Sequence, residues 1–412
     1  MRVKIRKIVK EQVEYLTGAF MDFFQQEAAS GIVLLLCAAV AMVLANSPLG
    51  ASYEHLLHQE IVLGFSGGTL SMSLLHWIND GLMAVFFFVI GMEIKREFLF
   101  GELKSLSATI LPIAAAIGGM VVPALIYVLL NLGQTSISGW GIPMATDIAF
   151  ALGVLAFAAK QAPRSIAIFL TALAIVDDLG GILVIAFFYT EQLNLTALLL
   201  GFAVLFLLGF LAKKQVEHIL PYLIGGLLVW YAFLQAGIHP TIAGVLLGFL
   251  LPAGTAKTMK QHLLYKAEHA LEPWSAYLIM PVFALGNAGI SLDAGSFSGI
   301  VSPIGLGVIL GLCLGKPLGI FLSAWLLIRL KLVKMPEGVR FVHFAGAGIL
   351  GGIGFTMSLF IASLAFANPA ELMTAKTGIV CASLLAGVSG ILFFKWIAWQ
   401  EERNAVEGEC SR

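Results

Sequence analysis

Charged side chains are scarce in this chain, and their scarcity excludes an ordinary soluble domain. Of the 412 residues, 12% are Asp, Glu, Lys or Arg and 59% are hydrophobic. A soluble domain carries about 25% charged residues. Because apolar runs of about 20 residues also recur along the whole length, the sequence predicts an all-α polytopic membrane protein.

Cysteine is also scarce, which excludes two further kinds of fold. Cys37, Cys313 and Cys381 lie in apolar runs, and Cys410 lies in the polar C-terminal segment. No Cys-x-x-Cys pair and no Cys/His ligand spacing occurs, so neither a disulfide framework nor a zinc site is expected. The net charge is zero, and no nucleic-acid partner is expected.

The N-terminal segment lacks the cleavage pattern of a signal peptide. It begins MRVKIRKIVK and is basic and amphipathic. We interpret residues 1–29 as an uncleaved helix on the cytoplasmic membrane surface. The whole chain, 1–412, is then one membrane domain, with a bundle over 30–399, a periplasmic hairpin loop at 48–74 and a cytoplasmic tail at 400–412.

Twelve apolar segments are long enough to cross a bilayer. Their limits are about 30–47, 75–96, 107–132, 139–159, 164–189, 194–212, 218–235, 237–253, 271–291, 302–328, 341–367 and 375–399. Lys and Arg test this count, because they concentrate in the cytoplasmic loops of membrane proteins. All 24 of them except Lys316 and Lys376 fall on one side of the membrane. The arrangement predicts that both termini are cytoplasmic.

A few charged residues lie inside the predicted spans. They are Asp147, Asp177, Asp178 and Lys316, with Asp80 nearer the end of a span. A charge at the bilayer centre costs about 2.5–3.5 kcal/mol on insertion scales, so such residues are rare and usually functional. A structural hydrogen bond is the simpler explanation for Asp80. Neighbours such as Asp177 and Asp178 point about 100° apart around a helix, so Asp177 can face Lys316 while Asp178 faces a cavity.

Two spans contain residues that break helices. Span 139–159 has Pro143 followed by Thr146 and Asp147, and span 341–367 contains the glycine-rich run GAGILGGIG. Close helix packing through small residues would explain either span alone. However, each is the middle member of a triplet, spans 3–5 and 10–12, and the triplets have opposite orientations. Discontinuous helices at corresponding positions of inverted repeats indicate the binding site of a secondary transporter.

The breaks also suggest roles for the charged residues. An interrupted helix leaves partial positive charge at one half-helix end and partial negative charge at the other. If the breaks cross, Asp147 could neutralise the positive ends and Lys316 the negative ends. Asp177 and Asp178 then remain as the expected transport pair. Carboxylate oxygens suit both a sodium ion and protons, and competition between them is sufficient for antiport when access alternates.

Two other classes of protein also place carboxylates inside the membrane. An intramembrane aspartyl protease needs its aspartates on separate helices and carries a GxGD signature, which is absent here. A cation channel uses rings of carboxylates from several equivalent chains. Lys316 has no role in protease chemistry, and an internal inverted repeat suits a carrier better than a channel. A carrier that couples another cation to protons is the closest alternative.

Several long motifs resemble the NhaA family of bacterial sodium/proton antiporters. They are GMEIKRE (91–97), MATDIAFALGVL (144–155), ALAIVDDLGGIL (172–183), GIHPTIAGVLLG (237–248), PVFALGNAGI (281–290), LGKPLGI (314–320) and GGIGFTMSLFIA (351–362). The resemblance implies electrogenic, alkaline-activated exchange of Na⁺ or Li⁺ for protons across the bacterial inner membrane. It implies a transporter without a resident cofactor, rather than an enzyme.

The resemblance also implies roles for individual residues. Asp177 and Asp178 would form the ion site, flanked by Thr146 and Asp147, and Lys316 would pair with Asp177 where spans 4 and 11 cross. The residues implied in pH sensing are Glu93, Lys95, Arg96, Glu97, His239, Glu268 and His269. From the residues alone, the charges at 93–97 are typical of a solvated, salt-bridged helix end.

The connection at 48–74 contains two runs with β-strand character. The segment EIVLGFSGGTLSMSL places them around Ser66, Gly67 and Gly68, which predicts a hairpin. A lone hairpin is marginally stable and has open edges. The family resemblance suggests that it pairs with the same hairpin of a second subunit to make a homodimer. The alternative is a hairpin that lies on its own protomer.

Overall fold

The computed structural model describes residues 29–65, 68–104, 106–158, 163–190, 193–255, 258–291, 299–336 and 338–410. Helices dominate the described residues, and one small two-stranded sheet accompanies them. The N-terminal surface helix predicted at 1–29 lies, apart from residue 29, outside the described residues.

Several helices are long and apolar enough to cross a membrane. Over the described ranges there are seven such helices, or up to ten if each of three bent helix pairs counts as one span. The seven are Leu74–Phe100, Thr109–Leu130, Ser165–Phe188, Leu195–Lys213, Ile219–Ala236, Pro303–Arg329 and Pro369–Arg403. This number is lower than the twelve spans expected from the sequence.

The difference arises at the eighth and ninth expected spans. The eighth contains only a short helix, α10 (Thr241–Leu250), because Pro240 and Pro252 limit it on either side. In the ninth, the helical segment is divided into α11 (Leu263–Trp274), the π-helical turn η5 (Ser275–Ile279) and α12 (Met280–Asn287). Helix α11 begins before the predicted limit of 271 and carries charged side chains, which lowers its hydropathy.

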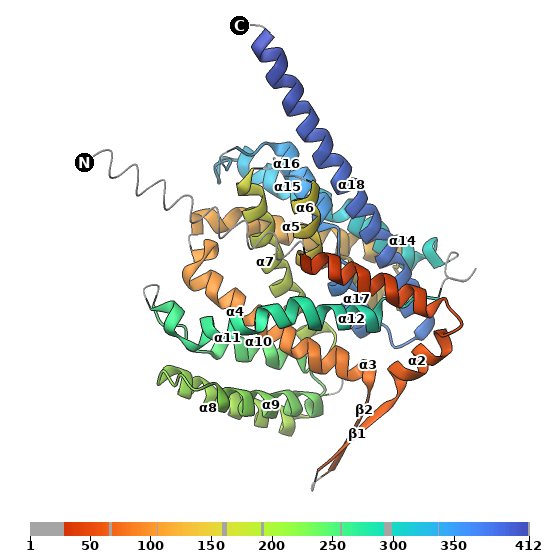
Figure 1. Cartoon of the computed structure of the whole chain (residues 1–412), viewed down its shortest axis with the longest axis vertical. Helices are drawn as coiled ribbons and strands as arrows, with labels where there is room; N and C mark the ends of the chain where they lie inside the picture. The colour runs from red at the N-terminus through yellow and green to blue at the C-terminus, as the bar shows by residue number, and fades with distance from the viewer. Residues whose placement is uncertain are drawn as a thin grey trace.

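One group of helices forms a panel. It contains α3 (Leu74–His76), η1 (Trp77–Leu82), α4 (Met83–Phe100), α8 (Leu195–Lys213), α9 (Ile219–Ala236), α10, α11 and α12. Helices α8 and α9 pack on each other and on α10, which packs closely on α4. At the α4–α10 contact, a Cβ atom at Gly91 would lie 2.5 Å from the carbonyl oxygen of Val245. In Figure 1, α8 and α9 lie at one edge of the molecule.

The remaining helices form a bundle that contains both broken spans. Its continuous elements are α5 (Leu106–Leu130), α7 (Arg164–Phe188), α14 (Pro303–Leu310), η6 (Gly311–Gly315), α15 (Lys316–Arg329) and α18 (Pro369–Cys410). Helix α5 packs on α7, α14 and α15. The bundle and the panel meet at an aromatic contact. The ring centroid of Phe360, in the bundle, lies 5.5 Å from that of Phe87 and 6.2 Å from that of Phe283, both in the panel.

Both spans with helix-breaking residues are interrupted. The first consists of the 3₁₀-helix η3 (Thr135–Met144) and α6 (Ile148–Ala158), bent by 45°. The second consists of α16 (Phe341–Gly351) and α17 (Phe355–Ala365), bent by 48°. The sequence pattern did not reveal that the first half of the earlier span is a 3₁₀-helix. The breaks, at 145–147 and 352–354, leave backbone donors and acceptors that need other partners.

The 48–74 segment contains a helix as well as strands. Helix α2 (Gly50–His58) turns by 112° from the helix Ala29–Ala45 and was not expected from the sequence. Strands β1 (Glu60–Phe65) and β2 (Gly68–Ser73) pair antiparallel with Glu60 opposite Ser73, and residues 66–67 between them lie outside the described residues. The strands extend away from the helices (Figure 1). The hydroxyl group of Tyr53 anchors α2 by donating to the carbonyl of Leu285.

The last helix is longer than the span expected at 375–399. Helix α18 begins at Pro369 and continues to Cys410, through most of the predicted tail at 400–412. Its C-terminal part is attached to the start of α16, because the Arg340 guanidinium donates to the Glu401 carboxylate at 2.5 Å. Short 3₁₀ turns, η2 (Glu102–Lys104) and η4 (Met259–Gln261), lie in connections between helices.

Candidate functional site

The two helix breaks touch one another inside the bundle. The Asp147 N–H donates to the carbonyl of Ile353 at 2.7 Å, which joins the two breaks directly. The Thr146 hydroxyl lies 3.0 Å from the carbonyl of Gly351, the last residue of α16. Segments about 200 residues apart in sequence are therefore held together by backbone groups that a continuous helix would have used internally.

The Asp147 carboxylate lies between the N-termini of α6 and α17. Its Oδ1 accepts from the Phe150 N–H at 3.1 Å, and its Oδ2 accepts from the Thr356 N–H at 3.1 Å and the Thr356 hydroxyl at 2.5 Å. The side chain is buried, with 1% exposure. Each half-helix N-terminus carries partial positive charge, so one carboxylate compensates two of them.

The Lys316 ammonium occupies the opposite electrostatic position. It lies 2.6 Å from Asp177 Oδ2 and also donates to the carbonyl of Met144, the last residue of η3. The carbonyl end of a helix carries partial negative charge, which favours a cation there. Lys316 is completely buried, and a buried charge needs such partners because its hydration is lost.

Asp177 and Asp178 have different surroundings although they are adjacent on α7. Asp177 Oδ2 accepts from Lys316 and from the Thr146 hydroxyl, at 2.6 Å in each case. Its Oδ1 is buried and has no hydrogen-bond partner in the described part of the chain. Asp178 is 8% exposed, and among the described residues its carboxylate accepts no hydrogen bond. Three carboxylate oxygens therefore remain available for a cation or a proton.

Part of the expected pH-sensing group comes together where the C-terminal part of α4 meets α11. The Arg96 guanidinium lies 2.7 Å from Glu268 and 2.6 Å from Glu97. Burial raises the pKa of the Glu268 carboxyl, while the charge of Arg96 acts in the opposite direction. Glu93 lies within electrostatic range of both Arg96 and Asp178, which connects this group with the ion site.

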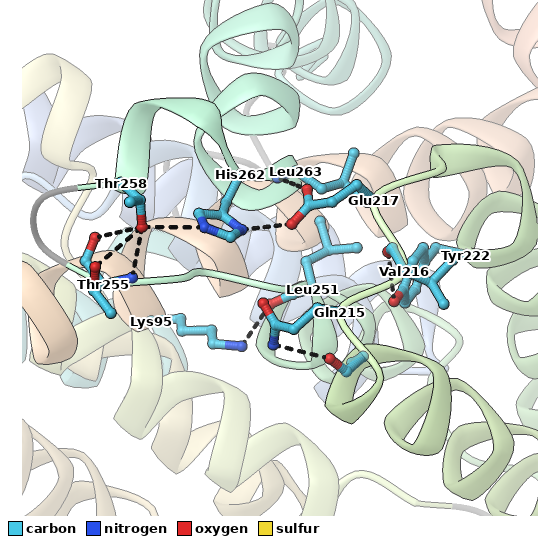
Figure 2. Close-up of polar contacts among 11 residues, drawn as sticks. Lys95, Gln215, Val216, Glu217, Tyr222, Leu251, Thr255, Thr258, His262 and Leu263 are labelled. Atoms are coloured by element: carbon cyan, nitrogen blue, oxygen red, sulfur yellow. Dashed lines mark hydrogen bonds and ion pairs between the residues drawn. The ribbon is translucent and has the colours of Figure 1, made fainter.

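The other expected members of this group are placed differently. The Lys95 ammonium donates to the carbonyls of Phe249 and Leu251, at 2.7 and 2.6 Å, and so caps the C-terminal end of α10. Figure 2 shows the bond to Leu251. His269 is exposed and stacks on Tyr265 at 3.8 Å. His239 precedes the opposite end of α10, so the structure separates it from the Arg96 group.

Several contacts at and near the site could not be found by sequence reasoning. Thr356 holds Asp147, and the Ser383 hydroxyl accepts from the Phe355 N–H at 3.2 Å. The sequence signal for Thr356 was a hydroxyl residue two positions after the glycine-rich run that interrupts the span. Before the start of α11, Glu217 contacts His262 at 2.5 Å and the Leu263 N–H at 2.6 Å (Figure 2).

Comparison with known proteins gives consistent matches over nearly the whole chain. The family model described as Na⁺/H⁺ antiporter 1 matches residues 21–394. The protein named Na(+)/H(+) antiporter NhaA 2 of Clostridium beijerinckii is 53% identical over 390 residues, which cover 94% of this chain and 96% of that protein. The Na(+)/H(+) antiporter NhaA of Vibrio campbellii is 50% identical over 378 residues, covering 91% and 94%.

A solved structure is similar in fold. The sodium proton antiporter MjNhaP1 of Methanocaldococcus jannaschii has a TM-score of 0.56, 16% sequence identity, and coverage of 92% of this chain and 97% of its own. At that identity the likeness concerns the fold alone. The family model and the close relatives together establish that this chain belongs to the NhaA family of sodium/proton antiporters.

Proposed function

We propose that this protein is a secondary active antiporter that exports Na⁺ or Li⁺ in exchange for external protons. The named relatives are Na⁺/H⁺ antiporters, which supports ion transport and argues against an enzyme. Sodium and protons are its substrates, and no resident cofactor is needed. The alternative is a carrier that couples a different cation to protons.

A single observation carries the proposal: a buried Lys316–Asp177 ion pair lies beside an Asp178 carboxylate that accepts no hydrogen bond from the described residues. Asp178 is the principal cation ligand, because its oxygens have no competing donor among the described residues. Asp177 is the principal proton carrier. Thr146 and Asp147 flank the pair, Thr146 through its bond to Asp177 and Asp147 through its place between two helix N-termini.

Exchange follows from competition for these oxygens. When sodium binds Asp178, its positive charge disfavours a proton on either carboxylate, so protons leave. When the site opens to the other side and sodium dissociates, protons return. Protonated Asp177 no longer needs Lys316 as a counter-ion. Lys316 then keeps the Met144 carbonyl as a partner, which avoids an isolated buried ammonium.

We further infer the arrangement in the membrane. Twelve spans with inverted repeats at spans 3–5 and 10–12, crossed at broken spans 4 and 11, would place the aspartate pair at the bilayer midplane. Both termini would be cytoplasmic at the bacterial inner membrane, and the two-stranded sheet would pair with its counterpart in a homodimer. The family resemblance implies electrogenic exchange, and two carboxylates permit more than one proton per sodium.

Regulation by pH is proposed for the cytoplasmic group. The Arg96–Glu268 pair joins α4 to α11, and Glu93 is electrostatically coupled to both Arg96 and Asp178. Charge changes at this group would therefore reach the ion site. Lys95, Glu97, His239 and His269 remain candidates through the family resemblance.

The test is sodium-driven proton movement by the purified protein in liposomes, recorded with a pH-sensitive dye at several external pH values. We expect Na⁺ and Li⁺ to release protons, and the rate to respond to an imposed membrane potential. Asp178→Asn is the matched control, since it keeps the volume of the side chain and removes its charge. Equal proton movement with K⁺ would favour the alternative carrier, and none with any cation would refute antiport.

A further inference from the structure

The Asp147 carboxylate depends on one side chain for its position. Of its three donors, Phe150 belongs to its own half-helix, whereas the other two both come from Thr356 on α17. Thr356 is completely buried. Its hydroxyl lies 2.5 Å from Asp147 Oδ2, within the range of a charge-assisted O–H···O⁻ bond.

This contact reaches the ion site through the backbone. Asp147 is adjacent to Thr146, whose hydroxyl lies 2.6 Å from Asp177 and 3.0 Å from the Gly351 carbonyl. Residues 145–147 interrupt one span and residues 352–354 interrupt the other, so neither break lies inside a continuous helix that would fix its backbone. The Thr356–Asp147 bond, the bond from the Asp147 N–H to Ile353 and the bond from the Thr146 hydroxyl to Gly351 together hold Thr146 against Asp177.

We infer that Thr356 is a positioning residue for cation binding: its hydroxyl fixes Asp147, and through Asp147 the oxygens of Thr146 and Asp177 that face the ion. The inference rests on the antiport proposed above and adds a residue that positions its cation site. Thr356 does not itself touch the cation. Small displacements of groups that bind a substrate are enough to weaken binding strongly.

The chain offers a matched set of variants. Thr356→Val keeps the shape of the side chain and removes the hydroxyl, while Thr356→Ser keeps the hydroxyl. Ser383→Ala is the control, because the Ser383 hydroxyl also bonds the N-terminus of α17, through Phe355, and is not among the donors that Asp147 has in the described part of the chain. All of these side chains are buried, so exposure does not distinguish them.

The experiment measures KM for Na⁺ and maximal rate in liposomes, together with calorimetric Na⁺ binding. We expect Thr356→Val to raise KM about tenfold or more, as loss of a hydrogen bond to a charged group does, with a smaller change in maximal rate. Thr356→Ser should restore KM to within about twofold, and Ser383→Ala should lower thermal stability without changing KM.

Other outcomes overturn the inference. An unchanged KM in Thr356→Val, or an equal rise in Ser383→Ala, would mean that the hydroxyl only stabilises the fold. If Thr356→Val does not fold, Thr356→Cys replaces it, because a thiol is a weak donor; a wild-type KM there has the same meaning. Absence of sodium-driven proton movement in the wild type would instead refute the proposed antiport.

Discussion

At the residue scale, the two aspartates of α7 differ in what holds them. Asp177 is bound by Lys316 and Thr146, whereas Asp178 accepts no hydrogen bond among the described residues. The geometry of a helix explains the difference, since neighbours about 100° apart cannot both face Lys316. Division of labour between ion ligand and proton carrier is therefore expected within the pair.

The first prediction separates these two roles. Asp178→Asn should lose sodium binding at every pH, because the amide cannot neutralise a cation. Asp178→Glu should keep some binding with lower affinity, since its charge is displaced by about one C–C bond. Asp177→Asn should abolish exchange and retain residual binding. Calorimetry with measured proton release checks this, and full-affinity binding by Asp178→Asn would contradict the assignment.

The second prediction concerns Lys316. Lys316→Ala should lower the free energy of unfolding by about 3–5 kcal/mol, because Asp177 and the Met144 carbonyl lose a buried counter-ion. Adding Asp177→Asn should recover part of the loss, because the uncompensated charge disappears. Thermal unfolding in detergent measures both variants. Equal stability of Lys316→Ala and the wild type would show that the pair does not support the fold.

At the element scale, side chains from two other parts of the chain bind the first two turns of α11. Arg96 binds Glu268 from α4, and Glu217 binds the first N–H of α11 from the α8–α9 connection. Glu217 therefore serves as an N-terminal cap supplied by another part of the chain. The panel depends on such polar contacts where its helices leave the apolar region.

The third prediction tests this cap. Glu217→Ala should lower the free energy of unfolding by about 1 kcal/mol, the usual effect of losing a helix cap. His262→Gln should lower it less, because the bond from Leu263 to Glu217 remains. Thermal unfolding of the two variants in one detergent gives the comparison. A larger loss for His262→Gln would show that the imidazole, rather than the capped backbone, is the main partner of Glu217.

The fourth prediction concerns pH and Glu268. Burial raises the folded-state pKa of Glu268 above the usual value of 4.5, so the folded protein holds this proton more tightly than the unfolded chain. The resulting contribution to stability is fully present below pH 4.5. The contribution is lost as the pH rises through the folded-state pKa. Glu268→Gln cannot titrate, so its Tm should fall less than that of the wild type between acid and neutral pH. Glu54→Gln, at an exposed position on α2, is the control and should follow the wild type.

At the scale of the whole molecule, the two-stranded sheet is the part least supported by the rest. The strands carry exposed Ile61 and Val62, and a two-stranded sheet has open edges. At its base, the Leu74 N–H donates to the Gln59 carbonyl at 3.0 Å, so the two ends of the sheet are adjacent. This geometry permits its removal without disturbing α2 or α3.

The fifth prediction uses this deletion. Replacing residues 60–73 by a short Gly-Ser link should convert the expected homodimer to a monomer and leave sodium-driven proton movement in place. The reason is that the ion site lies within the bundle, away from the strands. Native mass measurements and the liposome assay test the two parts. A dimer of unchanged mass would show that another surface joins the subunits.

The sequence by itself determined which segments are apolar, which charges lie inside them and where two spans are broken. These properties are local, because a helix in lipid must satisfy its own backbone groups and proline or glycine interrupts it at a definite residue. Asp147, Asp177, Asp178 and Lys316 were therefore recognisable as an intramembrane set. Their partners were recognisable only in part.

Only the tertiary structure decided which groups satisfy the broken backbone. Thr356 and Asp147 are 209 residues apart, and no pattern in either segment predicts the bond between them. The same holds for Lys95, which caps α10 although its neighbours suggested a salt-bridged surface. Such contacts depend on how separate helices pack against each other. Backbone donors and acceptors at a helix break or a helix end need a partner, and the packing decides which side chain comes within hydrogen-bond distance.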